Sequence, residues 1–332
     1  MIQILLLLSG LVLLVAGAHF AVQGSSRIAT RLGVPQLVIG MTLVAFGTGM
    51  PELVLNVLSA WNGSTSLAFG NLIGASTINV SFVLGVTAII SPLVVKRSVV
   101  TREIPLMILA GLALLALSSD TILGHYPVNL LDRADGIVLL LFFSVFLYYT
   151  IFDLATQSKG DSFVELVSSQ TRESTLDESK TSTRFLLFYI AIGLSAVTLG
   201  AKLALEGAVG FAAMLGISES IIGLTIVSFG TTLPELVTCL VAAKKGHHDL
   251  VLGNLVGSNL LNLMLFFGIV AFVQPIPLPA YGLYDLLFFS LLSLALAPIA
   301  MRGPMKITRG EGIFLVCFYL IGTMVRVFLL DS

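Results

Sequence analysis

Long apolar runs separated by short polar segments dominate the chain. A helix that crosses a bilayer needs about 20 apolar residues, and ten stretches come close to that length. They are residues 2–22, 36–61, 66–91, 104–119, 137–155, 185–205, 219–243, 249–273, 282–300 and 310–329. The first run begins without the basic residues of a signal peptide, so we interpret it as a membrane helix. The pattern predicts an all-α integral membrane protein with ten transmembrane helices.

A hydrophilic segment separates the fifth run from the sixth and covers residues 156–184. Its serines and mixed charges are typical of a linker and not of a folded domain. The chain is therefore predicted to consist of a first five-helix half at residues 1–155, this linker, and a second five-helix half at residues 185–332.

Basic residues indicate how the helices are oriented, because cytoplasmic loops are enriched in Lys and Arg. With the N-terminus placed outside, 14 basic residues fall in inside loops, whereas only Arg133 and Lys202 fall outside and Arg326 lies near the end of the last helix. This bias predicts that both termini lie outside and that the linker is cytoplasmic.

The two halves carry the same motifs at a constant offset of 183 residues. GMTLVAFGTGMPELV at residues 40–54 aligns with GLTIVSFGTTLPELV at residues 223–237, with ten of 15 positions identical. LAFGNLIGASTIN at residues 67–79 aligns in the same way with LVLGNLVGSNLLN at residues 250–262. An odd number of helices per half reverses the second copy in the membrane. The alignment therefore predicts two inverted five-helix repeats, with a site near the membrane midplane where they meet.

The composition agrees with a protein whose main partner is the lipid bilayer. Hydrophobic residues make up 57% of the chain and charged residues 11%, whereas soluble domains carry about 25% charged residues. A net charge of -1 argues against a nucleic-acid partner. Cys239 and Cys317 fall in apolar runs, so we interpret them as buried small hydrophobic residues and not as a disulfide.

Each copy of the first motif places a proline, Pro51 or Pro234, within a membrane run. A proline in a helix removes one backbone donor and clashes with the carbonyl four residues earlier. A freed carbonyl must face protein or water because it cannot face lipid. A packing kink is the simpler interpretation of either proline alone. Beside a Gly-Thr pair and a glutamate, a helix break lined with cation ligands is favoured.

Glu52 and Glu235 directly follow these prolines. A carboxylate at the bilayer centre costs at least about 2.5 kcal/mol and marks a functional site by default. The apolar runs hold almost no basic residue that could neutralise them, since Lys202 and Arg326 lie near helix ends, where they can snorkel. We therefore expect the two carboxylates to bind mobile cations.

Oxygen-bearing side chains recur at helical spacing around these carboxylates. Thr48 lies four residues before Glu52, as Thr231 does before Glu235, and Thr232 lies beside that face. The following helices carry two further series at four-residue steps, namely Asn71, Ala75, Asn79 and Asn254, Ser258, Asn262. Carboxylate, amide, hydroxyl and carbonyl oxygens favour calcium, sodium or magnesium over zinc or copper.

Two features of the second motif leave alternatives open. Asn71 and Asn254 are compatible with capping a helix start or break, and equally with binding ions. The glycine pairs fit close helix packing better than backbone access for a ligand. These pairs are Gly70 with Gly74 and Gly253 with Gly257.

FGTGMPEL with GNLIGASTIN, and FGTTLPEL with GNLVGSNLLN, resemble the paired repeats of the cation/calcium exchanger superfamily. The closest likeness is to the sodium/calcium exchanger branch, including prokaryotic members with a short central loop. The resemblance implies a secondary active antiporter of the cell membrane that exchanges sodium for calcium by alternating access, without a cofactor.

The resemblance also implies roles for individual residues. Glu52 and Glu235 match the calcium-binding carboxylates of the family. The positions that match sodium ligands are Thr48, Thr231 and Thr232, with the carbonyl oxygens of Ala45 and Ser228. The polar positions of the partner helices are matched by Asn79, Ser258 and Asn262.

Three positions depart from the family pattern. Gly49 and Ala75 stand where a hydroxyl is usual, and the second repeat keeps hydroxyls at Thr232 and Ser258. Some members carry Asp in place of Asn262, and in the family that difference is associated with proton or potassium sensitivity. Proton/calcium or potassium-dependent sodium/calcium exchange is therefore the alternative function.

Two other classes of function are disfavoured. An uncoupled cation channel would not need the inverted duplication. An intramembrane enzyme would need a catalytic group, and the sequence has no HExxH motif and no paired-aspartate or Ser-His arrangement at membrane depth.

Overall fold

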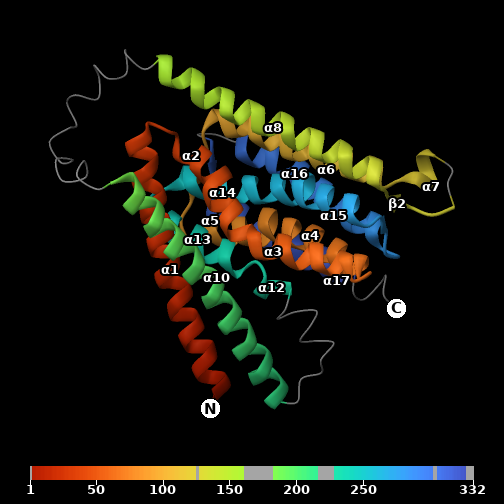
Figure 1. Cartoon of the computed structure of the whole chain (residues 1–332), viewed down its shortest axis with the longest axis horizontal. Coiled ribbons are helices and arrows are strands. Elements are labelled where there is room, and N and C mark those ends of the chain that lie inside the picture. The colour runs from red at the N-terminus through yellow and green to blue at the C-terminus, as the bar shows by residue number, and fades with distance from the viewer. Residues whose placement is uncertain (1, 125–126, 161–181, 216–227, 302–304, 327–332) are drawn as a thin grey trace.

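Long helices and short π-helical segments, labelled η, make up most of the first half (Figure 1). The structure, a computed structural model, describes residues 2–124, 127–160, 182–215, 228–301 and 305–326. In chain order, the first half contains α1 (Ile2–Leu32), α2 (Gln36–Ile39), η1 (Gly40–Val44), α3 (Ala45–Trp61), α4 (Thr65–Ile78), η2 (Asn79–Val83), α5 (Leu84–Ile90), η3 (Val99–Glu103), α6 (Ile104–Leu117), α7 (Asp120–Leu123) and α8 (Arg133–Gly160).

The second half repeats much of this order. Its described helical elements are α10 (Thr183–Met214), α12 (Ser228–Gly230), α13 (Leu233–Lys244), α14 (His248–Leu260), η7 (Leu261–Phe266), α15 (Phe267–Val273), α16 (Gly282–Met301) and α17 (Arg309–Val325). Local chemistry explains several boundaries. Thr308 and Glu311 form a reciprocal capping box at the start of α17, and Gly63, with a φ of 80°, permits the turn between α3 and α4.

Eight helices in the described part of the chain are long and apolar enough to cross a membrane. Each falls on one of the ten predicted runs. Of the other two runs, residues 310–329 correspond to α17, whose described length is 17 residues. Residues 219–227 of the seventh run lie outside the described residues, and the rest forms α12 and the 12-residue α13.

The first helix extends well beyond its predicted end. Its apolar run ends near residue 22, but α1 continues to Leu32. The extra turns carry Arg27 and Arg31, and they still bury Ser25, Ile28 and Ala29. An amphipathic stripe therefore continues the helix where hydropathy alone would end it.

The all-α expectation needs one correction, because four two-residue strands form two antiparallel ladders. Strand β1 (Leu93–Val94) pairs with β4 (Lys306–Ile307). Strand β2 (Leu130–Leu131) pairs with β3 (Ile276–Pro277). Each ladder joins a loop of one half to a loop of the other and satisfies backbone groups just beyond helix ends.

The centre of the molecule consists of the helices that carry the two motifs. In their most apolar windows, 72% of the residues of Thr65–Ile90 and 78% of those of His248–Val273 are buried, against 28% for α1 and 22% for α8. Phe69 of α4 and Phe267 of α15 meet edge to face in this core, with ring centroids 5.6 Å apart. The polar residues of the motifs are thus held where neither lipid nor bulk water surrounds them.

Helices α1 and α10 pack side by side along most of their length, and the N-terminal part of α1 and the C-terminal part of α10 project from the main bundle (Figure 1). Glycines at seven-residue intervals line both helices, namely Gly10, Gly17 and Gly24 on α1, and Gly193, Gly200 and Gly207 on α10. A Cβ added at Gly17 would lie 2.6 Å from the Val197 backbone nitrogen. The two backbones are therefore in direct contact, which only glycine permits.

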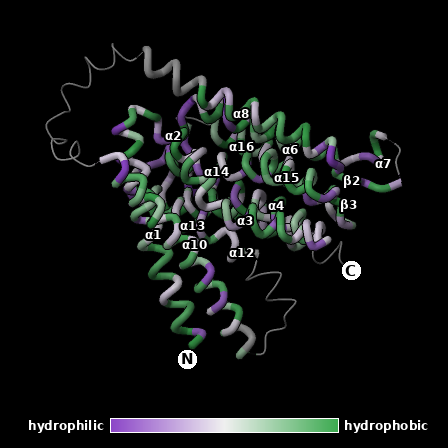
Figure 2. Tube along the Cα trace, viewed as in Figure 1, coloured by the Kyte–Doolittle hydropathy of each residue, from purple (hydrophilic) through white to green (hydrophobic). Residues whose placement is uncertain are grey.

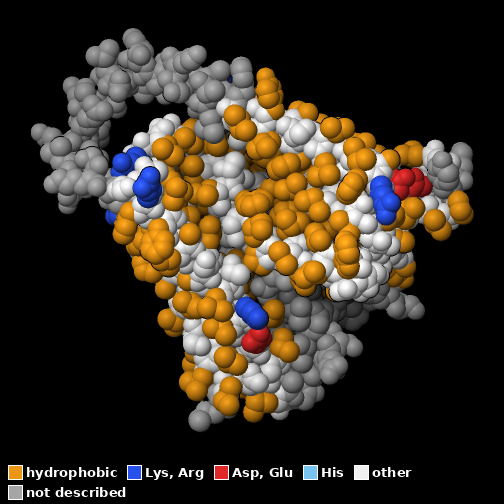
Figure 3. Space-filling view, in the orientation of Figure 1, with side chains coloured by type: hydrophobic (Ala, Val, Ile, Leu, Met, Phe, Trp, Pro, Cys, Tyr) orange, Lys and Arg blue, Asp and Glu red, His pale blue; other side chains and the backbone are white. Residues whose placement is uncertain are grey.

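The outer surface is what a protein surrounded by lipid requires. Hydrophobic residues occupy most of the helical positions in Figure 2, and hydrophilic ones gather mainly near helix ends and loops. Hydrophobic side chains cover much of the face shown in Figure 3, with a few clusters of charge between them. Exposed large residues such as Val12, Val145 and Ile321 contribute to this cover.

Candidate cation site

The first copy of the FGT motif lies on an unbroken helix. Helix α3 runs from Ala45 to Trp61 with Pro51 inside it, directly after the π-helical η1. The prediction of a helix break at Pro51 is therefore wrong. A single proline deprives the Gly47 carbonyl of its helical donor, but the turns on either side keep their hydrogen bonds.

The second copy is broken, as the sequence predicted. Helix α12 ends at Gly230, Thr231 and Thr232 form a turn, and α13 begins at Leu233. Thr232 has φ −96° and ψ 1°, between the helical and extended regions. Pro234 lies in the first turn of α13, where its missing N–H costs no helical hydrogen bond. The equivalent sequences therefore adopt different local structures.

The structure brings the two glutamates together in the core. Glu52 is 5% exposed and Glu235 is 1% exposed. Glu52 lies close enough to Glu235 for their charges to interact, and its carboxylate faces the Asn262 amide. Glu235 faces the Thr48 hydroxyl. One carboxylate from each half thus lies in the same part of the core.

Several oxygen atoms of the two carboxylates and of the motif-bearing helices are buried without a hydrogen-bond partner among the described residues. They are Oε1 of Glu52, both carboxylate oxygens of Glu235, Oδ1 of Asn79, Oδ1 of Asn254 and Oγ of Ser258. Buried polar groups are normally hydrogen-bonded, because leaving one unpaired costs about 1–3 kcal/mol. Unpartnered carboxylate, amide and hydroxyl oxygens on these helices have the chemistry of ligands for an oxygen-bound cation.

Fixed positive charge does not offset the two carboxylates within the described residues. The ion pairs there join Lys96 to Asp249, Lys202 to Glu206 and Arg326 to Asp285. None of these pairs includes Glu52 or Glu235. The negative charge of the site is therefore available to mobile cations.

Of the threonines and main-chain positions named from the sequence, Thr48 lies near Glu235. The Thr48 hydroxyl donates to the carbonyl oxygens of Val44 and Ala45, at 3.1 and 3.3 Å. That of Thr232 donates to the Phe229 carbonyl at 3.1 Å. Ala45 is fully buried, and Ser228 begins α12, just before the turn.

Both candidate asparagines of the partner helices lie in π-helical turns. Asn79 begins η2 and Asn262 is the second residue of η7, and each is 1% exposed. A π-helical turn aims a side chain differently from an α-helix and is frequent at functional sites. Spacing of four residues in the sequence gave no indication of this change of geometry.

Two further polar pairs were not found from the sequence. The Asn71 amide donates to Oδ1 of Asn56 at 3.1 Å, and the Asn254 amide donates to the Cys239 sulfur at 3.5 Å. Asn56 and Cys239 occupy equivalent positions of the two repeats, so the pairs correspond. Asn71 and Asn254 lie inside α4 and α14, so neither caps the start of its own helix. Cys239 is buried as predicted, whereas Cys317 is exposed, contrary to the prediction.

The space at Gly49 is occupied by an aromatic ring. A Cβ added there would lie 3.3 Å from the Phe266 ring. Ala75 is 3% exposed and brings no oxygen, whereas the equivalent positions of the second half carry the hydroxyls of Thr232 and Ser258. The ligand set is therefore richer in oxygen on the side of the second half.

The glycine pairs behave differently in the two halves. A Cβ at Gly257 would lie 2.5 Å from the Met41 backbone, so the second pair does pack closely, as predicted. Gly70 and Gly74 meet no comparable neighbour within the described chain. The segment equivalent to residues 37–41 is 220–224, which lies outside the described residues.

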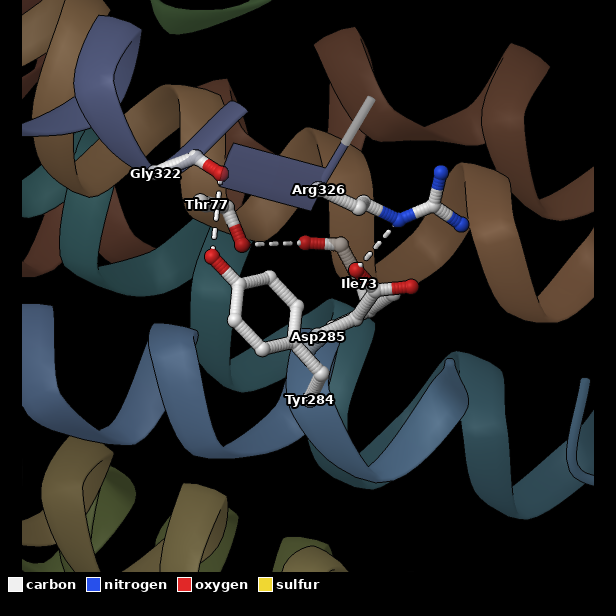
Figure 4. Close-up of polar contacts among 6 residues, drawn as sticks. All are labelled: Ile73, Thr77, Tyr284, Asp285, Gly322 and Arg326. Carbon is white, nitrogen blue, oxygen red and sulfur yellow. Dashed lines mark hydrogen bonds and ion pairs between the residues drawn. The ribbon is translucent and has the colours of Figure 1, made fainter. Parts of the chain in front are cut away.

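Arg326 does not simply extend to the membrane surface, as its position near a helix end had suggested. Its Nε donates to Oδ1 of Asp285 at 2.7 Å (Figure 4). Beside this pair, the Tyr284 hydroxyl donates to the Gly322 carbonyl at 2.9 Å, and Thr77 donates to the Ile73 carbonyl at 2.8 Å. The contacts of Arg326 and Tyr284 join the end of α17 to the start of α16, whereas that of Thr77 lies within α4.

The loop between α13 and α14 is tied to α1. The Lys245 ammonium donates to the His19 carbonyl at 3.4 Å, and Nδ1 of His247 lies 3.5 Å from the Ser26 hydroxyl. Burial lowers the pKa of His247, as do the nearby Lys245 and His248. Burial and the charge of Arg27 lower the pKa of Lys245. This loop therefore serves as a contact with α1.

Comparison with known proteins identifies what the chain is similar to. The family described as sodium/calcium exchanger protein matches residues 2–152 and 185–328. Inner membrane protein YrbG of Escherichia coli is 32% identical over 312 residues, which are 93% of this chain and 92% of that protein. The sodium/calcium exchanger MaX1 of Methanosarcina acetivorans is 29% identical over 340 residues, 96% of each chain. A solved structure of the sodium-calcium exchanger NCX_Mj, soaked with 10 mM Na⁺ and 10 mM Sr²⁺, has 30% sequence identity, a TM-score of 0.79 and 97% coverage of both chains.

Proposed function

Because the chain belongs to the sodium/calcium exchanger family, we propose that it exchanges sodium for calcium across the cell membrane by alternating access. The two ions compete for one site built around Glu52 and Glu235. Since occupancy by one ion excludes the other, the flow of sodium down its gradient drives calcium in the opposite direction. The protein acts as a transporter and not as an enzyme.

The observation that carries this proposal is the group of unpartnered buried oxygens around Glu52 and Glu235. Two carboxylates neutralise one divalent ion, or attract several monovalent ions in its place. Calcium takes six to eight oxygen ligands, and the amide and hydroxyl oxygens of Asn79 and Ser258 are available to complete its shell. A group of this kind is costly to maintain unless ions occupy it.

The threonine positions suit sodium. The hydroxyls of Thr48, Thr231 and Thr232 and the main-chain carbonyls of Ala45 and Ser228 belong to the helix segments that carry the carboxylates. Neutral oxygens added to a shared carboxylate form a shell of low charge, which suits a monovalent ion. Asn79, Asn262 and Ser258 complete the site from the partner helices.

The proposed topology has ten transmembrane helices in two inverted five-helix repeats. Residues 1–155 form the first repeat, residues 156–184 a cytoplasmic linker and residues 185–332 the second repeat, with both termini outside. Three observations support it: the constant motif offset, the equivalent glycines of α1 and α10, and the two strand ladders that each join one half to the other.

The test is calcium transport by the purified protein in proteoliposomes. An outward sodium gradient should drive uptake of radioactive calcium, and collapse of that gradient should stop it. Replacing sodium with choline at constant ionic strength is the control. If uptake is absent with a sodium gradient but follows a pH gradient, the protein is a proton/calcium exchanger instead.

The dependence on potassium needs its own comparison, because Asn262 replaces the acidic residue of some family members. Sodium-driven uptake should be the same with and without potassium on the side from which calcium enters. An absolute requirement for potassium would replace the proposal with potassium-dependent exchange.

A further inference from the structure

A chain of three side chains connects the two halves beside the cation site. The Thr231 hydroxyl, in the turn between α12 and α13, donates to Oδ1 of Asn71 at 3.5 Å. The amide of Asn71 donates to Oδ1 of Asn56 on α3 at 3.1 Å. Asn71 thus holds the broken segment of the second half against two helices of the first.

The repeat-equivalent chain consists of Thr48, Asn254 and Cys239, and only part of it is formed. Asn254 contacts Cys239 at 3.5 Å. Thr48, however, donates to main-chain carbonyls of its own helix. Oδ1 of Asn254, which would accept from Thr48, is buried and has no partner among the described residues. Asn254 itself is only 1% exposed.

The two motif copies differ in local structure in a way that corresponds to these contacts. The threonine that an asparagine holds, Thr231, lies in a helix break, whereas the threonine that no asparagine holds, Thr48, lies in the unbroken α3. Alternating access in transporters with inverted repeats moves one repeat against the other around a fixed site. Because the two halves here are equivalent in sequence and inverted, exchanging their conformations would produce the opposite-facing state. A contact made by one repeat in one state is then made by its equivalent in the other.

We propose that the Asn71–Thr231 contact stabilises the facing state seen here, and that an Asn254–Thr48 contact replaces it in the opposite-facing state. Asn71 and Asn254 are positioning residues that act through the two threonines. The inference rests on the proposed exchange function, because it assigns the two asparagines to the two ends of the transport cycle.

The proposal predicts opposite effects for two matched variants. One neutral hydrogen bond changes an equilibrium by about two- to tenfold. Asn71→Ala should reduce the population of the present state by that factor, and Asn254→Ala should reduce the population of the opposite one. Apparent affinity falls in proportion to the fraction of competent protein. The ratio of the apparent calcium constants on the two membrane faces should therefore shift in opposite directions, about two- to tenfold each.

Transport in oriented vesicles, with calcium titrated on each face in turn, measures this ratio. The double variant Asn71→Ala/Asn254→Ala should restore a ratio near that of the unmodified protein. If the two asparagines had a purely structural role, each substitution would weaken calcium binding on both faces. The double variant would then bind calcium more weakly than either single variant. Shifts in the same direction, or an unchanged ratio, would overturn the proposal.

Hydrogen exchange in detergent without ions tests the same inference independently of transport. Asn71→Ala should increase amide exchange in residues 45–52 and decrease it in residues 229–236, since the break moves from the second copy to the first. Asn254→Ala should change both segments in the opposite sense. A uniform increase in both segments would contradict the inference. Absence of sodium-driven calcium flux in the unmodified protein would instead refute the proposed function and leave this exchange result interpretable.

Discussion

At the scale of single residues, the two carboxylates dominate the electrostatics of the core. Glu52 and Glu235 lie close together, and the ion pairs of the described residues do not include either of them. Like charges at short range in a medium of low dielectric repel strongly. The ion-free site is therefore a source of instability that bound cations relieve.

Replacing Glu52 or Glu235 with Gln should abolish calcium transport while preserving the fold. If the lost charge contributes about 3 kcal/mol, calcium affinity falls roughly a hundredfold. The ion-free variants should melt at or above the temperature of the unmodified protein, because one uncompensated charge is gone. Size-exclusion thermostability with and without calcium measures both effects. Glu206→Gln, an exposed change, is the control, and retention of calcium-dependent stabilisation in either site variant would contradict the assignment.

The pair Gly49 and Phe266 offers a test of the uneven ligand set. Gly49→Ser adds the hydroxyl that the second half has at Thr232, and the Phe266 ring must move by only a few tenths of an ångström to admit it. The sodium dependence of transport should then become steeper, because another oxygen ligand is present. Gly49→Ala adds the same Cβ without the oxygen and should leave the slope unchanged. Equal slopes for both variants would show that the hydroxyl does not bind sodium.

The residues of the site could be inferred from the sequence to the extent that their chemistry is unusual in a membrane. A glutamate after a proline in an apolar run, present twice, indicated Glu52 and Glu235 directly. Asn56 and Cys239 could not be found in this way, because their roles depend on which helix lies opposite. The ring of Phe266 over Gly49 likewise depends on packing between distant segments.

At the scale of elements, α1 and α10 are joined backbone to backbone. Gly200→Leu should separate them, because a Cβ at this position would lie 2.5 Å from the Leu14 backbone nitrogen. Overpacking against main chain cannot be relieved by a rotamer change, so we expect a loss of about 3 kcal/mol in stability. Thermal unfolding in detergent measures this loss. Gly310→Ala, where a Cβ meets no described atom within 4 Å, should change little, and an equal effect of both would contradict the packing argument.

The contact between α16 and α17 is a second test at this scale. The side chains of Arg326 and Asp285 are 31% and 17% exposed, which places the pair between surface and buried ion pairs. Asp285→Asn or Arg326→Gln should each destabilise the protein by roughly 1 to 3 kcal/mol. The double variant should lose less free energy of unfolding than the sum of the losses of the two single variants. Additive losses in thermal unfolding would show that the pair contributes no coupling energy.

Most elements could be predicted from hydropathy, but the sequence did not show which of the two motif copies is interrupted. Identical FGT and PEL letters lie in the unbroken α3 and in the interrupted α12–α13 pair. Since the local sequence is nearly the same, the difference must come from the surroundings, among them the contact between Asn71 and Thr231. The motif sequence is compatible with both a continuous and an interrupted helix, and the structure shows one of these two forms in each copy.

At the scale of the whole molecule, the duplicated halves imply a definite arrangement in the membrane. Alkaline phosphatase, which is active only outside the cytoplasm, should be active when fused after residue 332 and inactive when fused within residues 156–184. Expression of both fusions in the same bacterial strain, with protein levels compared by blotting, provides the measurement. Activity of the linker fusion would overturn the proposed orientation, and inactivity of both would indicate an even number of helices after the linker.

The two small ladders have a consequence for how the protein is made. Strand β1 ends the motif-bearing part of the first half, but its partner β4 directly precedes the last helix. During synthesis, the backbone groups of β1 therefore remain unpaired until almost the entire chain has left the ribosome. The first half reaches its final structure only when the segment before the last helix has been made. A chain truncated before β4 therefore also lacks the β1–β4 pairing in its first half.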